Sequence, residues 1–103
     1  MNITKVQIHV LKEKNKTVVG YADIIIDGEF IVRSIVIREN DKNETYVTMP
    51  CQIHNDIRRD IAHPITEPCR VYVENTILDE YELVLNRMAS AREARENHQV
   101  TPT

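Results

Sequence analysis

The hydrophobic pattern of this chain changes its period about two thirds of the way along. Up to residue 49, apolar residues alternate with polar ones or form short runs rich in Val and Ile, which is typical of β-strands. From residue 73 onward, apolar residues recur every three or four positions, which places them on one face of a helix. The chain of 103 residues has the length of one domain. The sequence therefore predicts an α+β fold, in which a sheet is followed by a C-terminal helix.

The first half of the chain predicts an antiparallel meander of four strands. Val6, Ile8 and Val10 alternate with polar residues, as in a strand with one buried face. Asp27-Gly28 predicts a tight hairpin turn, because Gly tolerates positive φ. The remaining predicted elements are strands at 18–26, 29–37 and 45–49, charged or polar turns at 12–16 and 38–44, and a strand end at Pro50. Residues 70–73 form either a fifth strand or part of the helix.

The predicted helix follows a capping sequence. Thr66 is a candidate N-cap, Glu67 favours the positive end of the helix dipole, and Pro68 is tolerated in the first turn. Its apolar stripe is formed by Val73, Ile77, Tyr81, Val84 and Met88, and is widened by Leu78 and Leu85. Residues 88–98 form a surface extension of the helix or fray, and 99–103 are a loose end. We therefore expect one domain at 1–86, with a charged helical extension and tail at 87–103.

Composition restricts the compartment and the partners. No apolar run is long enough to span a membrane, and the opening MNITKVQIHV lacks the layout of a signal peptide. A cytoplasmic protein is expected, in which Cys51 and Cys69 are free thiols. The net charge of −3 argues against nucleic acid, but the negative excess lies after Tyr72. A local basic patch in the first two thirds of the chain is therefore allowed.

The segment RRDIAHPI, residues 58–65, brings together charged and polar side chains that could bind a ligand or take part in catalysis. A nucleophilic site could combine Cys51, Asp60 and His63, but no nucleophile elbow or oxyanion turn is recognisable nearby. Two glycines are too few for a phosphate-binding loop. Four zinc-type ligands also lie close in sequence, but with unusual spacing: Cys51, His54, His63 and Cys69. We expect no metal, cofactor, small-molecule substrate or enzymatic activity.

A structural role is the simpler interpretation of this segment. Ile61 and Ile65 would be buried anchors, and Pro64 would hold His63 in an extended conformation. His63 would then hydrogen-bond a backbone group where the sheet leads into the helix, and Asp60 would pair with an arginine or cap a turn. These residues would form a structural hinge.

The arginines beside this hinge have a different potential. Arg58, Arg59 and Arg70 surround the predicted start of the helix, where guanidinium groups can donate forked hydrogen bonds to phosphates. Exposed arginines that bind nothing in particular are the alternative.

The sequence resembles the SpoVG family, bacterial proteins named for sporulation stage V and septation. The most specific match is RDIAHPI, and weaker matches occur in the right order over about residues 1–85. These are Met1-Asn-Ile3-Thr4-Lys-Val6, DGEF at 27–30, Val47-x-Met49-Pro50 and Ile77-Leu78-x-x-Tyr81. The resemblance implies an antiparallel sheet with a C-terminal helix, assembled as a homodimer.

The resemblance also implies a regulator that binds DNA, or in some members RNA, in septation, sporulation or wider gene expression. The family's binding surface is attributed to the loop after Met-Pro and the segment leading into the helix. By position, Arg59 matches the family arginine, Thr66 begins the recognition segment, and Arg70 matches an arginine of some members. With Arg58, these residues are the candidate nucleic-acid contacts, and we expect the three arginines on one surface.

The chain departs from the family pattern in that loop. Cys51-Gln52-Ile53 replaces the usual Ser-Lys-Arg, and Arg58 replaces an aromatic residue. Two cations are lost and one is gained, which predicts weaker phosphate binding. A protein-interaction module of the same fold, without nucleic-acid binding, is therefore the alternative function.

Overall fold

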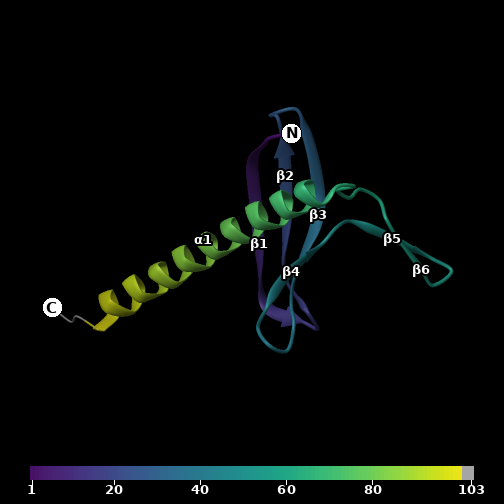
Figure 1. Ribbon diagram of the computed structural model, residues 1–103. Helices are drawn as coiled ribbons and strands as arrows, with labels where there is room; N and C mark the ends of the chain where they lie inside the picture. The colour runs from purple at the N-terminus through teal and green to yellow at the C-terminus, as the bar shows by residue number, and fades with distance from the viewer. Residues whose placement is uncertain (101–103) are drawn as a thin grey trace.

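In the computed structural model, residues 1–100 form six strands and one helix (Figure 1). The structure describes the backbone of residues 1–100 and the side chains of residues 1–91. The elements are β1 (Ile3–Asn15), β2 (Val18–Ile26), β3 (Phe30–Glu39), β4 (Thr45–Thr48), β5 (Cys51–His54), β6 (Ile57–Asp60) and α1 (Glu67–Val100). The α+β class, with a meander followed by one helix, is confirmed.

The first four strands form one antiparallel sheet in the order β1-β2-β3-β4. At the β2–β3 turn, Asp27 and Gly28 have φ values of 53° and 68°, as the central pair of a type I′ turn requires. The predicted turn at 12–16 is wrong in extent, because β1 continues through Asn15 and only Lys16 and Thr17 turn the chain. β1 lies at the edge of the sheet, where charged side chains reach water on either face.

The helix α1 crosses one face of this sheet, and the core lies between them (Figure 1). The buried residues from the sheet are Ala22, Ile24, Ile35 and Ile37, and those from the helix are Val73, Ile77 and Tyr81. Met88, predicted to lie in the apolar stripe, is 49% exposed. Burial, with a smaller contribution from Glu39, raises the pKa of the Tyr81 hydroxyl.

The start of the helix agrees with the predicted cap. The Cys69 N–H donates to Thr66 Oγ1 at 3.3 Å, and the Arg70 N–H donates to the Thr66 carbonyl oxygen at 3.0 Å. Residues 70–73 are helical, which decides between the two alternatives for this segment. The helix includes the predicted extension and continues to Val100, and residues 101–103 of the predicted tail lie outside the described range.

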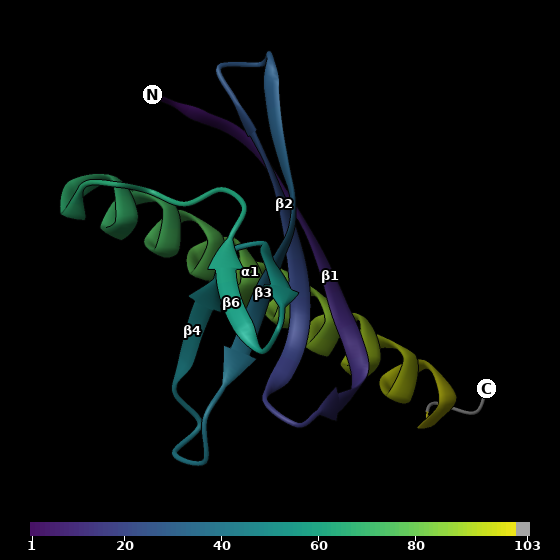
Figure 2. The ribbon, with the colours of Figure 1, turned by 90° about the vertical axis from the view of Figure 1, so that its right-hand side faces the viewer.

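β5 and β6 form a separate hairpin, which we call the arm (residues 51–60). The predicted elements do not include it. At its tip, Asn55 and Asp56 have φ values of 52° and 62°, and after Gly these are the residues that adopt this conformation most readily. Figures 1 and 2 show the arm projecting from the body of the protein.

Residues 61–65 connect the arm to the helix. Ile61 and Ile65 are 69% and 88% exposed, so the prediction that they are buried anchors is wrong for the single chain. The reason is that no element of the body covers this connection, which runs along the surface between the arm and α1 (Figure 2).

Candidate nucleic-acid interface

The two adjacent arginines lie on the arm, in strand β6. Successive side chains of a strand point to opposite faces. The register agrees, because Arg58 pairs with Ile53 on β5, whereas Arg59 pairs with Gln52. Both arginines are exposed. They therefore present their guanidinium groups on opposite sides of the arm.

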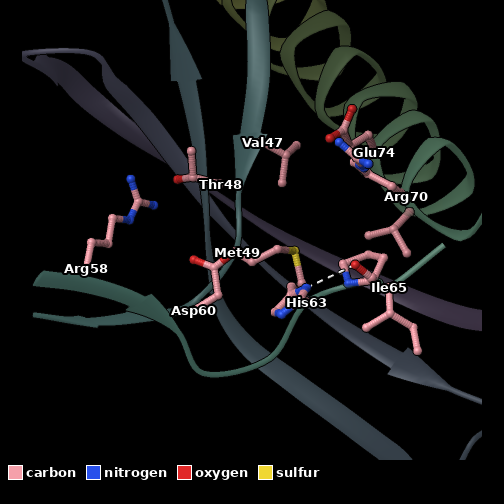
Figure 3. A pocket seen from close by; sticks show the side chains of 11 residues that line it. Val47, Thr48, Met49, Arg58, Asp60, His63, Ile65, Arg70 and Glu74 are labelled. Atoms are coloured by element: carbon pink, nitrogen blue, oxygen red, sulfur yellow. Dashed lines mark hydrogen bonds between the residues drawn. The ribbon is translucent and has the colours of Figure 1, made fainter. Parts of the chain in front are cut away.

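An open cavity of about 800 Å³ lies between the arm, the end of β4 and the start of α1. We call it the helix–arm cavity. Arg58 lines it from the arm and Arg70 from the helix, with Thr48 and His63 between them (Figure 3). Arg59 instead lines a second hollow with Gln52 and His54, on the other face of the arm. The prediction that all three arginines share one surface is thus correct for Arg58 and Arg70 and wrong for Arg59.

Within residues 1–91, the guanidinium groups in the helix–arm cavity form no ion pair. Among the described side chains, the one ion pair joins Lys14 Nζ to Glu39 Oε1 at 3.6 Å, on the sheet. Asp60 and Glu74 also line the cavity, but neither forms an ion pair with an arginine. The predicted pairing of Asp60 with an arginine is therefore not observed. The cavity combines two cations, Arg58 and Arg70, with two anions, Asp60 and Glu74. A phosphate is attracted near the arginines and repelled near the carboxylates.

His63 lies at the base of the arm, as the hinge interpretation requires. Its Nδ1–H donates to the Pro64 carbonyl oxygen at 3.0 Å, so the predicted hydrogen bond to a backbone group is present. The ring is exposed, which means that water can replace this partner. His63 therefore contributes less to stability than a buried histidine would.

Thr66 contributes to the helix start that borders the cavity. Its oxygen accepts the capping bond from Cys69, while its hydroxyl hydrogen has no acceptor in the described structure. A helix N-terminus carries a partial positive charge that favours anions. Arg70 lies in the first turn of the helix, where this partial charge adds to the charge of its side chain.

The cysteines do not form a metal centre with their neighbours in the described part of the chain. Cys51 and Cys69 are both free thiols, the first at the start of the arm and the second in the first turn of the helix. No group of three or more metal-type ligands occurs among the residues that the structure describes.

In the same part of the chain, no helix has the length and apolar character to cross a membrane.

A signal for the arm was present in the sequence. Ile53 and Ile57 flank Asn55-Asp56, which is a possible two-residue hairpin turn without glycine. The flanking segments hold only four residues each and are largely polar. For that reason hydrophobic periodicity could not reveal them.

The fold defines a class of small α+β domains: a four-stranded meander crossed by one helix, with a projecting hairpin arm that leads into that helix. The sequence profile of the SpoVG family matches residues 1–83. The chain belongs to the SpoVG family.

Several relatives carry the name "Putative septation protein SpoVG". The one from Agathobacter rectalis is 36% identical over 80% of this chain and 93% of its own length. The one from Clostridium perfringens is 34% identical over 84% of this chain and 94% of its own length. The one from Phytoplasma australiense is 33% identical over 94% of this chain and all of its own length.

Proposed function

We propose that the protein is a cytoplasmic, homodimeric regulator that binds DNA or RNA and acts in septation, sporulation or gene expression. It uses no cofactor and catalyses no reaction. The name of its relatives supports the link to septation. The observation that carries nucleic-acid binding is the helix–arm cavity, where Arg58 and Arg70 lie on opposite sides without ion-pair partners among the described residues.

The chemistry of the cavity suits a sugar–phosphate backbone. Guanidinium groups bind phosphate oxygens with forked, charge-assisted hydrogen bonds. Thr66 caps the start of the helix, one turn before Arg70. The cavity is open to solvent and holds two carboxylates. It therefore favours an extended, flexible chain that positions its phosphates at the arginines, away from Asp60 and Glu74.

The alternative is a protein-interaction module of the same fold without nucleic-acid binding. The exposed isoleucines of the arm and the carboxylates in the cavity favour it. The two functions differ in their response to salt, because phosphate contacts release counterions, whereas apolar contacts do not.

The test is a fluorescence-anisotropy titration of labelled duplex and single-stranded oligonucleotides, repeated at several salt concentrations. Each phosphate contact adds about −0.9 to the slope of log K against log salt for duplex DNA. Two arginines in each of two chains predict a slope of about −3.6. Arg58→Ala or Arg70→Ala should each reduce it to about −1.8.

Arg33→Ala is the matched control, because Arg33 is an exposed arginine on β3, away from the cavity. Its salt slope should equal that of the unmodified protein. Equal slopes for all three variants would place the binding surface elsewhere. Absence of binding at low salt to both duplex and single strands would leave the interaction module as the function.

A further inference from the structure

The four-stranded sheet has two faces, and α1 covers one of them (Figure 1). On β3, Ile35 and Ile37 point to the helix and are buried. Successive side chains of a strand point to opposite faces, so Val36 and Arg38 point away from the helix. We call this second face the open face. Its centre is formed by Tyr21, Val36, Arg38, Tyr46 and Thr48.

Two aromatic rings lie on the open face. Tyr21 on β2 and Tyr46 on β4 are 39% and 40% exposed. Tyr21 pairs with Val36 and Tyr46 pairs with Arg38, so the rings lie on either side of β3. From the spacing of strands and of residues along a strand, the two Cα atoms are about 12 Å apart. The rings can therefore hold two different flat groups of one ligand.

The guanidinium group of Arg38 is held in place beside Tyr46. Its Nε–H donates to Thr48 Oγ1 at 3.1 Å, and its Nη1–H donates to Thr17 Oγ1 at 2.7 Å. A guanidinium group has five N–H donors, so three remain for a ligand. Within residues 1–91, Arg38 forms no ion pair. Because the side chain is already ordered, a ligand that binds it loses less entropy than one that binds a free arginine.

The other charged groups of the open face are compatible with an anionic ligand. Lys5 pairs with Ile25, which places a second cation on this face. The carboxylate of Asp23 also lies there, but its Oδ1 accepts the Ser34 N–H at 3.1 Å. This bond supports the β3 bulge, where Ser34 has φ 64°. The anion is thus occupied by the backbone, whereas neither cation has an ion-pair partner among the described side chains.

We propose that the open face binds single-stranded nucleic acid, with one base stacked on Tyr21 and another on Tyr46. Arg38 donates hydrogen bonds to base or phosphate oxygens between them. Every base has a flat face that stacks on an aromatic ring, and a four-stranded sheet with exposed aromatic rings binds RNA bases in other folds. In a duplex the bases stack on one another and do not reach the rings. The inference takes its ligand class from the proposed function and adds a second site, which selects single strands.

The test is an anisotropy titration with two labelled strands of equal length. One is an oligothymidylate, and the other is an abasic strand, which keeps the phosphates and lacks the bases. Stacking on one aromatic ring typically contributes about five- to a hundredfold in affinity. Tyr21→Ala and Tyr46→Ala should each weaken oligothymidylate binding by a factor in this range. The salt slope should stay the same, because neither change removes a charge.

Phe30→Ala is the matched control. Phe30 is 64% exposed on the same sheet, but it pairs with Ile26 and so points to the helix side. This variant should bind oligothymidylate as the unmodified protein does. Tyr21→Phe and Tyr46→Phe should also retain binding, because they keep the ring. The abasic strand and a duplex should each bind equally to the unmodified protein and to both alanine variants.

Folding of the variants is checked by circular dichroism and their mass by light scattering. Both tyrosines are partly exposed, so the spectrum and the mass should not change. If an alanine variant fails to fold, Tyr21→Leu or Tyr46→Leu takes its place, because leucine keeps apolar bulk without an aromatic ring. A change of mass in the folded variants would show that the open face contacts another copy of the chain, and would overturn the proposal.

The outcomes separate this inference from the proposed function. Oligothymidylate affinity that is equal in the unmodified protein and both alanine variants overturns the stacking site alone. Equal weakening for the abasic strand and for oligothymidylate also overturns it, because the rings then bind no bases. Absence of binding to every strand and duplex at low salt overturns both proposals. Binding that depends on the tyrosines, with a duplex salt slope unaffected by Arg58→Ala and Arg70→Ala, supports the open face and refutes the helix–arm cavity.

Discussion

Gly20 tests how closely β1 and β2 approach each other. The chain has only one other glycine, which serves as the comparison. A Cβ atom built on Gly20 would lie 2.8 Å from the carbonyl oxygen of His9, a backbone atom of the neighbouring strand. Gly20→Ala therefore requires the paired strands to move apart. Overpacking of this kind costs about 1–3 kcal/mol, and the lower entropy of the unfolded chain offsets about 0.4–1 kcal/mol of it.

The expected net loss is about 1–2 kcal/mol, which lowers Tm by about 5–15 °C in a domain of this size. The assay is urea and thermal unfolding followed by circular dichroism, at one fixed protein concentration. Gly28→Asn is the control. Gly28 has φ +68° with no atom near its Cβ position, and Asn tolerates that conformation. A Gly20→Ala protein as stable as the unmodified one would refute the close approach.

Two further predictions concern the helix. Thr66→Ala should lower the unfolding free energy by about 1 kcal/mol through loss of the cap, and Thr66→Ser should restore it; equal stability of all three proteins in urea unfolding would contradict the capping bond. Burial raises the pKa of Tyr81, so the unfolded chain ionises this hydroxyl first as pH rises. Stability should therefore fall as pH rises above about 10, and Tyr81→Phe should weaken this dependence in unfolding curves measured across that range.

The meander and the helix could be predicted because their signals are local and repeated. Asp27-Gly28, the β-branched runs and Pro50 each restrict the same segment of chain in the same way. Thr66 also has the capping role that its position indicated. The length of β1 was not predictable from composition, since charged residues form turns and edge strands equally well.

The positions of the arginines could not be predicted, because they depend on four residues of unrecognised strand. If residues 58–59 formed a loop before the helix, Arg58 and Arg59 could both reach the same phosphate. In β6 they point to opposite faces, so only Arg58 joins Arg70 at the helix–arm cavity. The exposure of Ile61 and Ile65 has a similar origin, since burial depends on which element covers a segment and not on its own sequence.

The division of the arginines restricts how a nucleic acid can bind. A single backbone in the helix–arm cavity can contact Arg58 and Arg70 of one chain, while Arg59 faces the other way. Contact with Arg59 requires a second stretch of nucleic acid on the outer face of the arm, or a second copy whose body lies there. The slope of about −3.6 counts only Arg58 and Arg70, so Arg59→Ala should leave it unchanged. The same anisotropy titration tests this, with Arg58→Ala as the comparison. A slope reduced by Arg59→Ala as much as by Arg58→Ala would show that nucleic acid also contacts the outer face of the arm.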